Sequence, residues 1–203
     1  MKKIFTNSIL LSSLLVSLFN VNAQETTLKY CGSTEKYLER LKQHPEILDE
    51  ERKLDAFTRE FEKEKKSSKS QQAPYIIPIV FHIVHQYGSE NISDAQIIDA
   101  VRILNEDFRK LNADTVDIVP QFKQIATDAN IEFRLAKKDP NGNCTNGIDR
   151  IASLETNVGD DGSKLNPWDR SKYLNIWVVK TISSGAAGFA YYPSSVTSSP
   201  SID

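Results

Sequence analysis

The sequence predicts an α+β fold, in which a helix packs across a twisted mixed sheet and a helical segment precedes both. Two stretches carry most of this prediction. Residues 76–86, IIPIVFHIVHQ, are dense in apolar and β-branched side chains, as in a buried strand. Residues 93–111 repeat apolar side chains every three to four positions, as in a helix that covers a sheet. A strand, a helix and then further strands are typical of a sheet with a helix on one face.

The predicted helix over 93–111 has a clear start. Ser93 and Gln96 have the spacing of a capping box, in which each residue accepts a hydrogen bond from the backbone N–H of the other. The apolar side chains that follow fall on one face: Ile97, Val101, Leu104, Phe108 and Leu111. Residues 125–129 predict a further short helical turn. In the strand before this helix, Pro78 should lie near the start or at a bulge.

Four shorter stretches predict further strands. Residues 131–136 alternate between apolar and polar side chains, as in a half-buried strand, and 148–151 and 173–179 are rich in apolar residues. Residues 188–192 have the character of a short edge strand that Pro193 ends. These stretches complete the predicted mixed sheet.

The first 23 residues have the three parts of a secretory signal peptide. Lys2 and Lys3 form the positive start, Ile9–Phe19 is an apolar run, and small residues precede a cleavage point before Gln24. We therefore expect a secreted chain that keeps no membrane anchor. A retained anchor is the alternative, but the apolar run is short for a membrane span.

Residues 24–73 form a second, highly charged unit. Pro45 separates two helix-favouring stretches, whose thin apolar stripes comprise Tyr37, Leu38 and Leu41, and then Leu54, Phe57 and Phe61. Such stripes suit helices that lie on another surface; a partly disordered, solvated tail is the alternative. The run KKSSKSQQ at 65–72 predicts an exposed linker that a processing protease could cut.

Composition excludes some classes of function. The 203 residues carry a net charge of -2, and loss of the two lysines in the signal peptide leaves 23 basic residues against 27 acidic ones. This balance gives no basic footprint for nucleic acid. With 39% hydrophobic residues, the chain can form one domain and a smaller appendage. Cys31 and Cys144 are too few for a disulfide scaffold, although they could pair in an oxidising compartment.

Two of the three histidines lie close together but do not predict a metal site. His82 and His85 are three residues apart in the predicted strand, so their side chains should point to opposite faces of the sheet. Helical zinc pairs have the form H-E-x-x-H, and Ile83 stands where that glutamate would be. We expect two hydrogen-bonded histidines of the sheet, with His44 solvated. The chain has neither a G-x-S-x-G motif nor a glycine-rich phosphate loop.

Five stretches in register resemble the N-terminal half of the catalytic domain of the pappalysin (cytophagalysin) metalloproteases, a branch of the metzincins. The resemblance covers residues 76–203. The stretches are IPIVFHIVH (77–85), ISDAQIIDAVRILNEDFRKLNAD (92–114), IEFRLAKKDPNGNCTNGIDR (131–150), WDRSKYLNIWVV (168–179) and AGFAYYP (187–193).

The resemblance implies a zinc endopeptidase with a metzincin-like N-terminal subdomain. The family holds its zinc with three histidines of H-E-x-x-H-x-x-G-x-x-H, and the glutamate of this motif is the general base. The 203 residues do not contain the motif. We therefore expect residues 74–203 to stop before the zinc-binding helix, the zinc ligands to lie beyond residue 203, and this chain alone to be inactive. Calcium binding stays open.

The resemblance also implies two site roles. A cysteine of the pro-segment keeps some family members latent by ligating the zinc, and Cys31 lies where such a switch would be, so residues 24–73 would form a pro-segment. A disulfide with Cys144 and a thiol that binds no metal are the alternatives. The family's edge strand binds extended substrate main chain to main chain, and an ordinary edge strand is the alternative. The matching residues are Gly188, Phe189, Ala190, Tyr191 and Tyr192.

The leading hypothesis is a secreted zinc endopeptidase that acts on proteins or peptides and binds neither nucleic acid nor, after signal cleavage, a membrane. A non-catalytic secreted module that binds proteins or peptides along an exposed edge strand is the alternative. A third hypothesis is the product of a disrupted gene without function.

Overall fold

The computed structural model describes residues 31–65 and 73–196. The predicted signal peptide and nearly all of the predicted linker lie outside these residues. The described helices are α2 (Ser33–Gln43), α3 (Ile47–Lys65), α4 (Asp94–Phe108) and α5 (Pro193–Val196). The strands are β1 (Tyr75–His85), β2 (Ile131–Leu135), β3 (Ile148–Ala152) and β4 (Leu174–Val178). The described residues also form three short 3-10 helices: η2 (Ala113–Asp117), η3 (Leu154–Asn157) and η4 (Asp161–Ser163).

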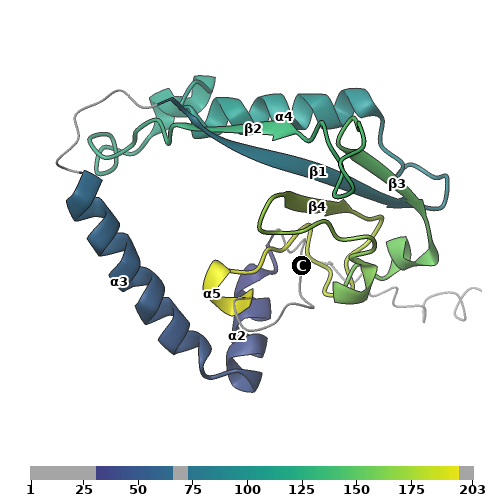
Figure 1. The fold of residues 1–203 in the computed structure, drawn as a ribbon, viewed down its shortest axis with the longest axis horizontal. Coiled ribbons are helices and arrows are strands. Elements are labelled where there is room, and N and C mark those ends of the chain that lie inside the picture. The colour runs from purple at the N-terminus through teal and green to yellow at the C-terminus, as the bar shows by residue number, and fades with distance from the viewer. Residues whose placement is uncertain (1–30, 66–72, 197–203) are drawn as a thin grey trace, which may run out of the picture.

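All three other strands pair with β1, which is the long central strand (Figure 1). Its first half pairs with β2 and its second half with β3, while β4 pairs with the middle of β1. Because Ile79 pairs with β2 and β4, and Phe81 with β3 and β4, β4 must lie on the edge opposite both other strands. Every pairing is parallel, so the expected mixed sheet is parallel in the strands that the structure describes.

Pro78 lies inside β1, three residues after its start. It pairs with Arg134 of β2, and the pairing with β4 begins only at the next residue. At Pro78 the strand therefore has one described neighbour, and the missing N–H costs little there.

The two faces of β1 are covered by different elements, as the alternation of a strand requires. Helix α4 lies along one face (Figure 1), where Ile79, Phe81 and Ile83 pack with Ile97 and Phe133. The residues between them face the other way; Val80 packs with Ala136 and Trp168. The sequence prediction of a helix across a sheet, and so an α+β fold, is confirmed.

The predicted capping box of α4 is also present. Ser93 Oγ accepts a hydrogen bond from the backbone N–H of Gln96, and Gln96 Oε1 accepts one from Ser93, with N···O distances of 3.3 and 2.9 Å. The helix ends earlier than predicted, at Phe108, because Lys110 has a φ of 54° and turns the chain out of the helix. Leu111 is therefore exposed rather than packed on the helix face.

The predicted helical turn at 125–129 is wrong. The structure places a 3-10 helix earlier, at η2, and residues 126–130 have no regular structure. Lys110 Nζ donates a hydrogen bond to the carbonyl of Ala126 at 2.6 Å, and the backbone N–H of Ala129 bonds Phe108 O at 2.9 Å. These bonds tie the chain to the end of α4 instead of leaving it to form its own turn.

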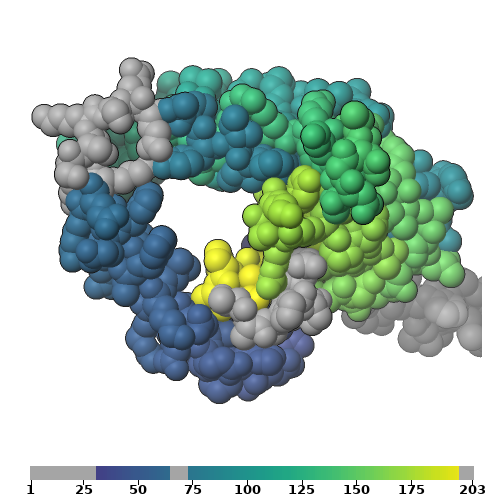
Figure 2. All heavy atoms as spheres, in the orientation of Figure 1, coloured from purple at the N-terminus to yellow at the C-terminus, as the bar shows by residue number. Residues whose placement is uncertain are grey.

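The N-terminal segment, defined here as residues 31–65, forms the two predicted helices on either side of Pro45. The apolar stripe of α3 is nevertheless exposed: Leu54 is 42% exposed, Phe57 67% and Phe61 44%. Figure 2 shows an open space between α3 and the sheet, with α5 at its lower border. No helix within 31–65 or 73–196 is long and apolar enough to cross a membrane.

Candidate functional site

The segment Gly188–Tyr192, which the sequence predicts to be an edge strand, is not a regular strand. Its residues have no regular secondary structure, and Pro193 begins helix α5 rather than ending a strand. The reason lies in the partners of its backbone. Gly188 O accepts a hydrogen bond from the backbone N–H of Gly32 at 2.9 Å, and the N–H of Ala190 donates to Ser33 Oγ at 2.9 Å. The N-terminal segment supplies both of these partners, and from Ser33 onward it is helix α2. A regular strand would need a second extended chain beside residues 188–192, with which to form a continuous ladder of hydrogen bonds.

Gly32 allows the close approach of the two segments. A Cβ atom at this position would lie 3.1 Å from the Cβ of Ala186 and 3.5 Å from the Cβ of Phe189. The first distance is shorter than ordinary van der Waals contact between carbon atoms. Any other residue would therefore have to move the chain away from residues 186–189.

One face of α2 places two cations over two aromatic rings. Lys36 Nζ lies 5.2 Å from the centroid of the Phe189 ring, and the Arg40 guanidinium lies 5.7 Å from that of Tyr191. Both distances are in the range of cation–π attraction. Arg40 is also buried, and its Nε donates to the carbonyl of Ser195 at 3.0 Å.

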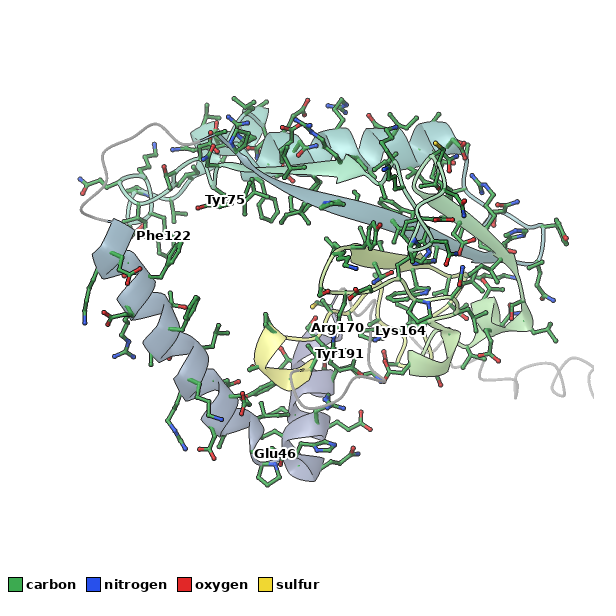
Figure 3. All side chains as sticks on the ribbon, viewed as in Figure 1. Glu46, Tyr75, Phe122, Lys164, Arg170 and Tyr191 are labelled. Carbon is green, nitrogen blue, oxygen red and sulfur yellow. The ribbon has the colours of Figure 1, made fainter. Side chains whose placement is uncertain are left out.

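The carboxylate of Asp161, at the start of η4, links these groups from the other side. Tyr191 donates its hydroxyl hydrogen to Asp161 Oδ2 at 2.6 Å, and Lys164 Nζ lies 3.0 Å from Oδ1. Lys36 Nζ lies 3.9 Å from Oδ2. The ammonium group of Lys164 is 4.5 Å from the Tyr191 ring centroid, and Figure 3 shows these two side chains together beneath β4.

This arrangement fixes the charges of both acidic groups. Burial alone would raise the pKa of the Asp161 carboxyl, but the Tyr191 hydrogen bond and the ammonium groups of Lys164 and Lys36 outweigh it and hold that pKa below its ordinary value. Burial raises the pKa of the Tyr191 phenol, and its bond to the Asp161 carboxylate raises it further. Near neutral pH the site therefore holds a carboxylate anion and a neutral phenol.

A groove of about 850 Å³ lies next to these residues. Strand β4 lines it together with Gly159, Asp160, Ser163, Lys164 and residues 186–191, 193 and 196, whereas Asp161 lies outside the lining. The sequence-predicted residues Gly188, Phe189, Ala190 and Tyr191 are among the lining, whereas Tyr192 is not. Tyr192 instead packs edge-on against Tyr37 of α2, with 5.4 Å between the ring centroids.

The two sheet histidines point to opposite faces and have separate partners. His82 is fully buried; its Nδ1 lies 3.2 Å from Asp149 Oδ2 and its Nε2 2.9 Å from Asn175 Oδ1. His85 Nδ1 accepts from the backbone N–H of Tyr87 at 3.2 Å. The sequence prediction of hydrogen-bonded sheet histidines is confirmed.

The network around His82 continues into the loop before β4. Asn175 Oδ1 accepts from the backbone N–H of Trp168 at 2.9 Å, and Asn175 Nδ2 donates to the carbonyl of the same residue at 2.8 Å. The ring of His82 also stacks on Trp177, with centroids 5.0 Å apart. These contacts occupy every polar atom of the histidine, which explains its place in an apolar strand.

The two cysteines do not pair with each other. Cys31 is exposed and directly precedes Gly32, and Cys144 is exposed in the turn that follows β2; no disulfide joins them. Within residues 31–65 and 73–196, no three histidine, cysteine or acidic side chains lie together as a metal ion would need. The described residues therefore do not form a zinc site by themselves.

Sequence reasoning missed Asp161, Lys164, Lys36 and Arg40. The spacing of Lys36 and Arg40, four residues apart on a helix, was a signal that they share one face. Nothing in the sequence places Asp161 near them, because they are more than 120 residues apart and meet only through the tertiary fold.

The solved structures that resemble this chain include mirolysin and its zymogen. Promirolysin of Tannerella forsythia, solved as a mutant, is 37% identical over 86% of this chain and 58% of its own, with a TM-score of 0.59. Mature mirolysin from the same organism, in complex with a cleaved peptide, is 46% identical over 52% of this chain and 42% of its own, with a TM-score of 0.45. Mirolysin with compound 9 gives 44% identity over the same shares and a TM-score of 0.46. The chain thus spans less than two thirds of each relative's length. No protein-family model and no curated protein matches it.

Proposed function

Because the chain belongs to the metzincin-clan zinc metalloproteases, whose members include mirolysin, we propose that it is part of a secreted endopeptidase held latent by its own N-terminal segment. In this proposal residues 24–73 are a pro-segment, and residues 74–203 are the N-terminal half of a catalytic domain. The substrate is a protein or peptide.

The observation that carries the proposal is the contact between Gly32–Ser33 and Gly188–Ala190. Gly32 bonds Gly188 main chain to main chain, and Ser33 accepts from Ala190. An extended peptide that adds to a sheet edge uses the same backbone N–H and C=O groups. The N-terminal segment therefore holds the groups that a substrate would need, and it must leave before a peptide can bind there.

We propose that zinc is bound mainly by residues outside 31–65 and 73–196, the part of the chain that the structure describes. His82 and His85 are engaged elsewhere, and the motif H-E-x-x-H-x-x-G-x-x-H is not among the 203 residues. We therefore propose that the three histidine ligands belong to sequence other than these 203 residues.

Cys31 is proposed as the one zinc ligand of this chain. A thiolate is a strong zinc ligand, and here it would take the coordination position that the attacking water needs. The neighbouring Gly32 and Ser33 hold this cysteine at the start of the peptide-binding edge. Cleavage in the linker at 65–72 would then allow the whole segment to depart.

A measurement of zinc and of proteolysis on the complete secreted gene product tests this function. The intact protein should hold about one zinc per chain and hydrolyse an unfolded protein substrate slowly. After cleavage within residues 65–72 the rate should rise at least tenfold, and Cys31→Ser should raise it without cleavage. A zinc-free, well-folded protein that never hydrolyses the substrate contradicts the proposal; if it still binds peptides along 188–192, it is a non-catalytic binding module.

A further inference from the structure

We propose that Ser195 controls how soon the N-terminal segment leaves after the linker is cut. Its hydroxyl is buried without a hydrogen-bond partner while the segment is docked, and it regains water when the segment departs. The unfavourable burial of this group weakens the docked state. The inference rests on the proposed function, because it concerns the release of the same inhibitory segment, and it adds a residue of the catalytic half that sets the rate of release.

Helix α5, which contains Ser195, is covered by the N-terminal segment. The helix lies in the angle between α2 and α3 (Figure 1) and contacts both, more extensively than it contacts any other described helix or strand. Arg40 Nε of α2 donates to the carbonyl of Ser195 at 3.0 Å, and Ser194 Oγ donates to Glu51 Oε1 of α3 at 3.4 Å. Departure of the two helices therefore uncovers both serines.

The hydroxyl of Ser195 is the exception among the buried polar groups. The residue has no exposed surface, and of the buried side-chain polar atoms within 31–65 and 73–196, Ser195 Oγ is the one without a hydrogen-bond partner. The carbonyl of the same residue is paired with Arg40, so the missing bond concerns the hydroxyl alone. A hydroxyl buried in this way gives up its hydrogen bonds to water and gains none in return.

The neighbouring Ser194 provides the contrast. It lies in the same turn and is also buried, but its hydroxyl bonds the Glu51 carboxylate, to which the hydroxyl of Tyr37 is hydrogen-bonded as well. Removal of the Ser194 hydroxyl takes a hydrogen bond from the docked state, whereas removal of the Ser195 hydroxyl takes none. The two serines should therefore affect docking in different directions.

Retention of the cut segment tests the role of Ser195 without any need for catalysis. The complete secreted gene product is cut within residues 65–72, and native mass spectrometry measures the fraction of segment that stays bound as the complex is diluted. Ser195→Ala should hold the segment about tenfold more tightly than the wild type, because no unpaired hydroxyl has to be buried. Ser194→Ala, the same change at the adjacent residue, is the control and should hold the segment no more tightly than the wild type.

The delay between cleavage and activity gives a second readout. Differences in affinity between variants of one interface arise mostly from the rate of dissociation. Ser195→Ala should therefore lengthen the delay about tenfold after the linker is cut, and the final rate of hydrolysis should equal that of the wild type.

The outcomes separate this inference from the proposed function. If Ser195→Ala retains the segment no more tightly than the wild type, or if Ser194→Ala gains as much, the proposed role of Ser195 is overturned, whether or not the protein hydrolyses a substrate. If retention rises as expected but the cut protein never hydrolyses a substrate, the proposed endopeptidase fails, while Ser195 still controls the departure of the segment.

Discussion

Replacing Gly32 with valine should release the N-terminal segment and make the uncut protein active. A Cβ at this position already lies 3.1 Å from the Cβ of Ala186, and the two methyl groups of valine add further volume. The backbone has to retreat, which breaks the bond from Gly32 to Gly188 O. Overpacking of this kind costs about 1–3 kcal/mol, so docking of the segment should weaken by about 5- to 150-fold.

Two readouts on the complete gene product check this result. The rate of substrate hydrolysis before linker cleavage should rise by the same factor, and the segment should dissociate faster after cleavage. Thr34→Val is the matched control, because it introduces the same side chain at an exposed position of α2 two residues away. The Gly32→Val protein could instead hydrolyse substrate before linker cleavage no faster than the wild type, and release the cut segment no faster. In that case the docking contact does not control activity.

Replacing His82 with alanine should cause the largest loss of stability. The ring is fully buried, bonds Asp149 and Asn175, and stacks on Trp177. Its removal leaves a cavity and takes one partner from the Asp149 carboxylate, which is only 25% exposed and keeps a hydrogen bond from Asn166. Loss of one member of a buried charged or hydrogen-bonded pair, together with the cavity, lowers the free energy of unfolding by about 3–5 kcal/mol.

Urea unfolding of the full chain, followed by tryptophan fluorescence, measures this loss. Trp177 and Trp168 both lie against the His82 ring, so the signal reports on the same region. His44→Ala is the control: His44 pairs with Glu46 at the surface between α2 and α3, and such pairs contribute little. A His82→Ala protein as stable as this control would show that the network is dispensable.

The elements predicted correctly are those whose signals are local. The apolar run of β1, the capping box at Ser93 and the alternation in β2 each depend on neighbouring residues, and the structure has all three. The errors at Leu111 and at 125–129 arise where a positive φ at Lys110 and tertiary hydrogen bonds decide the chain's path.

The site was predictable only in part, because its contacts are not of the kind that hydrophobic patterns reveal. The apolar stripe of α2 suggested the docking face, yet Leu38 is 49% exposed and the buried residue of the helix is Arg40. The helix docks mainly through cations over Phe189 and Tyr191, and through Gly32. Hydrophobic periodicity indicated only Tyr37 of this face, which packs against Tyr192, and the peptide-binding role of residues 188–192 came from the resemblance alone.

A disulfide trap tests most directly whether the N-terminal segment covers the proposed peptide-binding edge. Ser33→Cys and Ala190→Cys are combined in the complete gene product, with Cys31 and Cys144 replaced by serine. Ser33 Oγ lies 2.9 Å from the backbone nitrogen of Ala190, so sulfur atoms on these two residues would lie within reach of each other, and Gly32 stays unchanged. We expect the bond to form on mild oxidation and to hold the segment in place after the linker is cut. Two cysteines that stay reduced under these conditions would contradict docking of the N-terminal segment against residues 188–190.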